Sequence, residues 1–228
     1  MSRGSKLFFP VVAVLGLSGF PPQARASGDG SETIHPFGSH LARLELTVEP
    51  GVFTEISPGI VQRPSAPYAA AHPDAPLFGR DPANFRPLNV APFETQQFRK
   101  GLPVGQTLGQ WLAASGQAVV ECTSSGGAEV EMSFRGLKPN GVYTLWQVEP
   151  AADFGPLGGN GALNSFLADS EGEGEFQVLL GFCPGEVAAT VTTALALHFD
   201  AKTNGDSPGG GLPGGTVFAV QMLADLNR

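Results

Sequence analysis

Hydrophobic and polar residues alternate in the second half of the chain with the two-residue period that is typical of β-strands. Residues 129–134 alternate polar side chains with large apolar ones, which predicts a strand with one buried and one solvated face. The segment Val142–Val148 is rich in β-branched and aromatic residues, which favour strands. Similar segments separated by turn sequences predict strands at 118–123, 129–134, 142–148, 164–168, 175–180, 191–199 and 216–223.

Apart from one short helix predicted at 107–114, no helical period separates these segments. The strands at 164–168 and 175–180 are expected to form a hairpin, and the last two strands are expected to pair. We therefore predict an all-β domain at 105–228, a two-sheet antiparallel β-sandwich of about seven to eight strands. The order Cys122, Trp146, Cys183 is similar to that of immunoglobulin domains, although a predicted strand lies between Cys122 and Trp146. This similarity supports an immunoglobulin-like or related sandwich and nothing finer.

Residues 27–104 differ from the rest of the chain because they contain 11 of its 20 prolines. Proline removes a backbone donor and disfavours helix at the residue before it. We therefore predict an irregular, proline-rich N-terminal extension that wraps the sandwich and adds one strand, at 41–48. Its phenylalanines indicate that it packs on the domain, since disordered segments are poor in aromatic residues.

The first 26 residues have the pattern of a secretory signal peptide. Arg3 and Lys6 precede the apolar run 7–20, and small residues, Ala24 and Ala26, stand at the expected cleavage site. The apolar run is short for a membrane span and contains Pro10. We expect a periplasmic or secreted protein with no stable membrane span after cleavage.

The charge of the chain argues against nucleic acid as a partner. Without residues 1–26 the chain has 10 basic and 21 acidic side chains, a formal net charge of −11. Such a charge repels phosphate backbones, and the sequence has no basic stripe to offset it.

Cys122 and Cys183 are the only cysteines. An even number of cysteines in an exported chain predicts a disulfide between them. Two reduced buried thiols, or a thiolate bound to a metal, are the alternatives.

His198 and Asp200 lie two residues apart at the end of a predicted strand, so their side chains point to the same side. Together with a histidine from the extension (His35, His40 or His72) they could ligate copper or zinc. The alternative is a half-exposed histidine that ends a strand, with Asp200 opening the turn. A blue-copper site is disfavoured because Glu186 follows Cys183 where a histidine is expected.

The sequence has no G-x-S-x-G nucleophile elbow and no phosphate-binding loop, so no catalytic residues are predicted. The sequence does not decide whether the chain is an enzyme, although it favours a protein without catalytic activity.

Three segments, Gly136–Val148, 165–178 and 197–209, resemble a set of uncharacterised exported bacterial and archaeal proteins. Those proteins share a G-L-x-P-x-G-x-Y-T-x-W strand and an H-x-D-x-x-T-x-G-x-x-P-G segment. The resemblance covers about residues 105–210, roughly half of the chain, and implies a β-sandwich and export, but no activity. The matching positions of the last segment are His198, Asp200, Thr203, Gly205, Pro208 and Gly209.

The sequence therefore predicts an exported, non-catalytic β-sandwich that binds or supports an unknown envelope or extracellular partner and needs no cofactor. The alternative is an exported copper- or zinc-binding or redox-related protein that uses His198. A hydrolase whose site the sequence does not reveal is a third hypothesis.

Overall fold

The structure is a computed structural model. It describes residues 32–39, 51–84, 86–148, 154–158, 164–203 and 217–227. The predicted signal peptide, 1–26, and the predicted strand at 41–48 lie outside them. Within these ranges, no helix is both long and apolar enough to cross a membrane.

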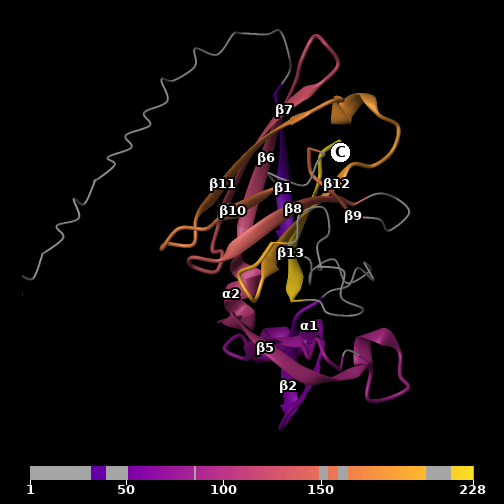
Figure 1. Cartoon of the computed structure of the whole chain (residues 1–228), viewed down its shortest axis with the longest axis vertical. Helices are drawn as coiled ribbons and strands as arrows, with labels where there is room; N and C mark the ends of the chain where they lie inside the picture. Colours follow the sequence, from indigo (N-terminus) through magenta and orange to yellow (C-terminus); the bar gives the residue numbers. More distant parts are fainter. Residues whose placement is uncertain are drawn as a thin grey trace, which may run out of the picture.

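Most of the molecule is one nine-stranded antiparallel sheet (Figure 1). Its order is β10-β8-β12-β13-β1-β6-β7-β11, and β9 pairs with β8. The strands are β1 (Thr33–Ser39), β6 (Ser115–Cys122), β7 (Ala128–Arg135), β8 (Val142–Val148), β9 (Phe154–Pro156), β10 (Ser165–Leu167), β11 (Gly174–Leu180), β12 (Thr192–His198) and β13 (Phe218–Asp225).

The sheet curls into a sandwich-like half-barrel around one core, which confirms the all-β prediction. β1 joins the two halves, because its residues 33–37 pair with β6 and residues 38–39 pair with β13. The two edges of the sheet approach each other through Phe166 on β10. Its ring stacks on Phe134 of β7 at 5.5 Å and on Tyr143 of β8 at 5.6 Å.

The predicted hairpin of β10 and β11 is wrong. β10 pairs with β8, whereas β11 forms a seven-residue ladder with β7. The turn between them instead carries the chain from one edge of the curled sheet to the other. The predicted pairing of the last two strands is confirmed by the β12–β13 ladder.

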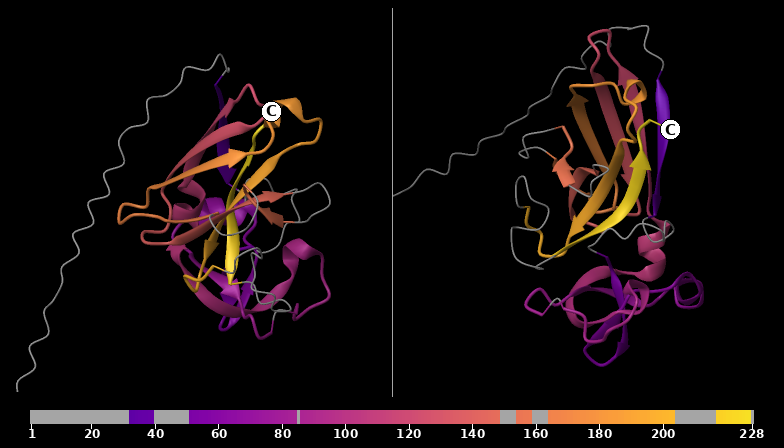
Figure 2. Two further views of the ribbon diagram at one scale, coloured as in Figure 1. Left: turned by 45° about the horizontal axis from the view of Figure 1, so that its top comes forward. Right: turned by 90° about the vertical axis from the view of Figure 1, so that its right-hand side faces the viewer.

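The proline-rich segment is not an irregular extension, contrary to the prediction from its prolines. It supplies β1 and a small closed barrel of order β2-β3-β5-β4 (Figure 2). Its elements are β2 (Phe53–Ser57), β3 (Ile60–Gln62), the helix α1 (Ala66–Ala71), β4 (Pro76–Arg80), the 3₁₀ helix η2 (Phe93–Thr95) and β5 (Gln97–Thr107). Pro76 begins a strand, and Pro103 pairs with Phe78 where the ladder is irregular. Strand starts and bulges are where a sheet accepts proline.

The short predicted helix is confirmed as α2 (Leu108–Ala113), which lies between the small barrel and the large sheet. Thr107 and Gln110 form a capping box at its start. Trp111 is fully buried, and its backbone carbonyl accepts a hydrogen bond from Gln221 on β13. Residues of the barrel belong to the same core cluster as Trp111. The barrel is therefore packed firmly on the sheet.

Gly101 on β5 allows β4 and β5 to approach closely. A Cβ atom at this position would overlap the backbone carbonyl of Arg80. We expect Gly101→Ala to lower the free energy of unfolding by about 1–3 kcal/mol, because the backbone would have to shift. Urea unfolding measures this change, with Gly181→Ala as the control because a Cβ atom added there would meet nothing within 4 Å. Equal stability of the two variants would contradict the expected clash.

Candidate functional site

His198, the predicted metal ligand, is a buried histidine and only 2% exposed. Its Nε2 atom lies 2.8 Å from the hydroxyl oxygen of Thr144 on the adjacent strand β8. The same oxygen accepts a hydrogen bond of 2.7 Å from the indole N–H of Trp146. The imidazole is therefore held in a short polar chain on the sheet and is not accessible to a substrate.

The surroundings of His198 favour the neutral imidazole. The ring shares its face of the sheet with a second apolar cluster, which includes Ala196 and Phe218, and it stacks on the Phe218 ring at 5.8 Å. Burial lowers the pKa of His198, while the negative charge of Asp200 and the backbone of Lys202 oppose this shift. At neutral pH the ring acts as an uncharged hydrogen-bonding partner.

The lowered pKa of His198 makes stability depend on pH. Below the unfolded-state pKa of about 6.5 the unfolded chain takes up a proton that the folded chain resists. Stability is therefore expected to fall as the pH drops from 6.5 towards the folded-state pKa. Urea unfolding between pH 5 and pH 8 should show a smaller decline for His198→Gln than for the natural chain. The same change at the exposed His72 is the control, and equal declines for both variants would contradict this role of His198.

The structure does not gather the other predicted ligands around His198. The carboxylate of Asp200 accepts a hydrogen bond from the backbone N–H of Lys202 and so organises the turn after β12. His35 contacts Thr33 on β1, and the ring of His72 packs against that of Tyr68 with 4.4 Å between the ring centroids. His40 lies outside the described residues. Within the described part of the chain, no three His, Cys, Asp or Glu side chains are grouped as a metal site requires.

Cys122 and Cys183 form a disulfide, with 5.3 Å between their Cα atoms. The bond joins the end of β6 to the segment before the 3₁₀ helix η3 (Pro184–Glu186). Because both sulfur atoms are in this bond, neither is a thiolate that could bind a metal.

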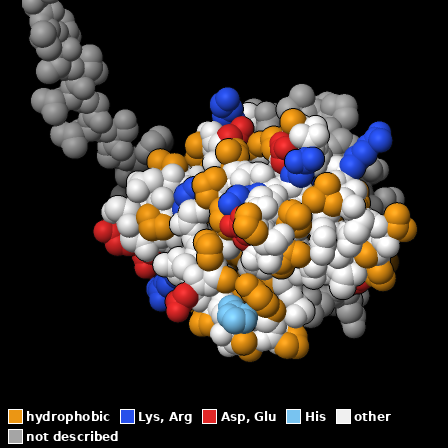
Figure 3. Space-filling model, turned by 90° about the horizontal axis from the view of Figure 1, so that it is seen from below, with side chains coloured by type: hydrophobic (Ala, Val, Ile, Leu, Met, Phe, Trp, Pro, Cys, Tyr) orange, Lys and Arg blue, Asp and Glu red, His pale blue; other side chains and the backbone are white. Residues whose placement is uncertain are grey.

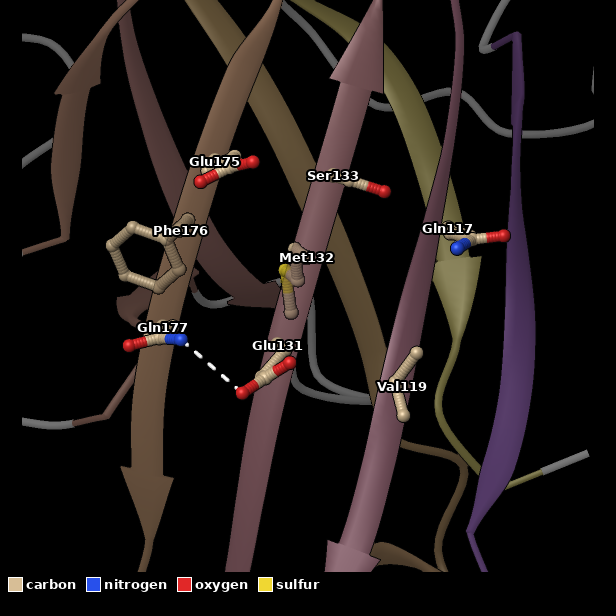
Figure 4. A pocket seen from close by; sticks show the side chains of 8 residues that line it. All are labelled: Gln117, Val119, Glu131, Met132, Ser133, Glu175, Phe176 and Gln177. Carbon is tan, nitrogen blue, oxygen red and sulfur yellow. Dashed lines mark hydrogen bonds between the residues drawn. The ribbon is translucent and has the colours of Figure 1, made fainter. Parts of the chain in front are cut away.

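One surface hollow of about 430 Å³ lies on the strands β6, β7 and β11 (Figure 4). The side chains of Glu131 and Gln177 cross it and form a hydrogen bond of 3.2 Å. Its lining residues are Gln117, Val119, Glu131, Met132, Ser133, Glu175, Phe176 and Gln177. Met132 and Phe176 are buried in the core, so the accessible part of this hollow is polar and acidic.

The small barrel carries two further hollows, neither of which was predicted from the sequence. The first, of about 450 Å³, lies beside α1 and is lined by Thr54, Glu55, Ile56, Ser57, Pro58, Tyr68, Ala75 and Pro76. The second, of about 300 Å³, lies between the loop after β4 and strand β5 and is lined by Ala83, Asn84, Arg86, Pro87, Leu88 and Arg99.

Exposed apolar side chains also concentrate on the small barrel and its loops. Among the described residues, the large hydrophobic side chains that are exposed are Ile34, Ile56, Leu88, Val90, Leu102, Leu167 and Leu179. Four of these seven belong to residues 51–107. A view onto this end shows apolar side chains interspersed with basic and acidic ones (Figure 3).

The two parts of the molecule differ in charge. Residues 51–107 have five basic and four acidic side chains, a formal charge of +1. Residues 108–228 have four basic and thirteen acidic side chains, a formal charge of −9. The small barrel therefore repels an anionic partner less than the acidic segment 108–228 does.

One local signal in the sequence indicates the hairpin of β2 and β3 in the small barrel. Pro58-Gly59 is a turn dipeptide, and apolar β-branched residues flank it, Ile56 before and Ile60 with Val61 after. Gly59 adopts a φ of 78°, which the turn requires. The prolines of the region outweighed this hairpin signal in the prediction.

Comparison of the chain with protein-family models, with curated proteins and with solved structures gives no significant match. The fold and the surfaces place the chain in a broad class, all-β proteins built on a curled antiparallel sheet with a disulfide.

Proposed function

We propose that this chain is an exported, non-catalytic binding module that recognises an envelope or extracellular partner through its small barrel, residues 51–107. One observation carries the proposal: among the described residues, four of the seven exposed large apolar side chains lie on this part, which also carries two surface hollows. Exposed apolar patches with polar surroundings are typical of interaction surfaces.

The large sheet has the properties of a scaffold for such a surface. Backbone hydrogen bonds tie the start of α2 to the barrel, from Leu108 N–H to Ala75 and from Gly109 N–H to Pro73. The side chain of Gln106 donates to the backbone carbonyl of Gly136 in the sheet. Loops that are held on a rigid support are well suited to recognition, because they lose little conformational entropy when they bind.

The disulfide and the N-terminal sequence support export. Disulfides persist in oxidising compartments outside the cytoplasm, and the pattern of residues 1–26 is that of a signal peptide. Both observations together support a periplasmic or secreted location.

A binding role without a cofactor predicts the metal content of the chain. The protein purified without chelator, and its His198→Ala variant, are expected to hold far less than one copper or zinc per chain. The reason is that Nε2 of His198 is already hydrogen-bonded to the hydroxyl group of Thr144. Elemental analysis by mass spectrometry measures this ratio. One metal ion per natural chain that disappears in the variant would support the metal-binding alternative instead.

The proposal is tested by cosedimentation of the purified mature protein with envelopes of the organism that makes it. The double variant Ile56→Ser, Val90→Ser removes exposed apolar groups from the barrel. The double variant Leu167→Ser, Leu179→Ser is the matched control on the large sheet. We expect the barrel variant to lose about tenfold in affinity, as two contributing contacts imply, and the control to keep its affinity. Undiminished binding of the barrel variant, or no binding by the natural chain, would overturn the proposal.

A further inference from the structure

The hollow between the loop after β4 and strand β5 brings two arginines together. Arg99 belongs to β5, whose backbone pairs with β3, and Arg86 belongs to the loop that follows β4. Both side chains line the same space of about 300 Å³. Pro87 and Leu88 add apolar surface, and Leu88 is 47% exposed.

Hydrogen bonds hold the walls of this hollow in place. The backbone N–H of Leu88 donates to the carbonyl of Gln97, and the Gln97 N–H donates to the side chain of Asn89. Asn89 also donates to the carbonyl of Thr95, which closes the loop on itself. A hollow of this kind is largely preformed, so a ligand would lose little binding energy in ordering it.

The two guanidinium groups have unused donors. Both residues are exposed, and neither side chain makes a hydrogen bond or a close ion pair with another residue that the structure describes. The neighbouring Lys100 is instead bonded to Glu55 at 2.8 Å. The nearby carboxylate of Asp81 accepts hydrogen bonds from Asn84 and from the backbone N–H of Ala83. These bonds, and the charge of Arg99, lower the pKa of Asp81, which stays ionised and shapes the loop.

We propose that the hollow lined by Arg86, Pro87, Leu88 and Arg99 binds a small oxyanion, a carboxylate or phosphate group that carries a short apolar chain. The guanidinium fork matches these anions through paired hydrogen bonds. The apolar chain lies against Pro87 and Leu88. This inference rests on the proposed function, because it names the ligand chemistry of one part of the small barrel.

The acidic segment 108–228 does not contribute to anion binding. A chain with a formal charge of −9 over residues 108–228 repels anions at long range. Anion binding therefore has to come from the local pair of arginines, and it weakens as added salt screens their charge.

Isothermal titration calorimetry of the purified full-length mature protein tests the site, with acetate, hexanoate and inorganic phosphate as probes. We expect hexanoate to bind about tenfold more tightly than acetate, since part of its chain is buried. The double variant Arg86→Gln, Arg99→Gln is expected to lose at least about tenfold in affinity for each anion that binds. Arg135→Gln is the matched control, because that side chain is 81% exposed on β7.

Each outcome of the titration is decisive. Tighter binding of phosphate than of acetate assigns the site to phosphate esters, and the reverse assigns it to carboxylic acids. Absence of binding by all three probes, or equal affinity of the double variant and the natural chain, would overturn the inference. Urea midpoints of both variants show whether they are folded. Envelope binding without anion binding would overturn this inference alone, whereas anion binding without envelope binding would overturn the proposed partner alone.

Discussion

Replacement of both Cys122 and Cys183 by serine is expected to lower the free energy of unfolding by about 4 kcal/mol. The two cysteines are 61 residues apart in sequence, so the disulfide closes a long loop in the unfolded chain. Without the bond this loop gains conformational freedom, and the unfolded state is stabilised. The folded state also loses the link between β6 and the segment that follows β11.

Equilibrium unfolding in urea measures this loss from the midpoint and slope of the transition. A reducing agent provides the matched control: it should destabilise the natural chain by a similar amount and leave the double variant unchanged. A natural chain whose midpoint is the same with and without reductant would show that the bond contributes nothing to stability.

Trp111→Ala is expected to lower the free energy of unfolding by about 3–5 kcal/mol, the range for removing a large buried aromatic side chain. Trp111 is fully buried in the core cluster that joins the small barrel to the curled sheet. Its loss leaves a cavity at this junction, so the packing of the barrel on the sheet is weakened. We expect the barrel to become more open to proteolysis than the sheet.

Trp111→Phe is the matched variant for this experiment. The indole nitrogen of Trp111 has no hydrogen-bond partner among the described residues. Replacement by phenylalanine therefore reduces the buried side-chain volume but removes no hydrogen bond that the structure records. Trp146 is the only other tryptophan and reports unfolding by fluorescence in both variants. Equal destabilisation by alanine and phenylalanine would mean that the volume of the side chain does not matter at this position.

Much of the large sheet could be predicted from local pattern. Val142–Val148 was predicted with the bounds that the structure shows, because alternating β-branched and aromatic residues specify a strand wherever it pairs. The helix α2 was predicted near its observed bounds, since apolar periodicity and the following Ser-Gly are signals within a few residues.

The small barrel could not be predicted by the same reasoning. Its prolines are frequent, and proline is compatible with a strand only at starts, edges and bulges. Whether a given proline occupies such a position depends on the partner strand, as Pro103 opposite Phe78 illustrates. The site proposed at Arg86 and Arg99 could not be predicted for the same reason, since the two arginines line one hollow only when β5 closes the barrel.

The amino-acid sequence by itself determined the all-β class, most strands of the large sheet, the helix α2 and the pairing of the two cysteines. Each of these depends on spacing along the chain or on residue type. Only the tertiary structure decided that β1 joins the halves of the sheet, that β10 and β11 lie at opposite edges, and that His198 is buried against Thr144. These features depend on which distant segments bury each other's apolar faces, and local periodicity does not specify that choice.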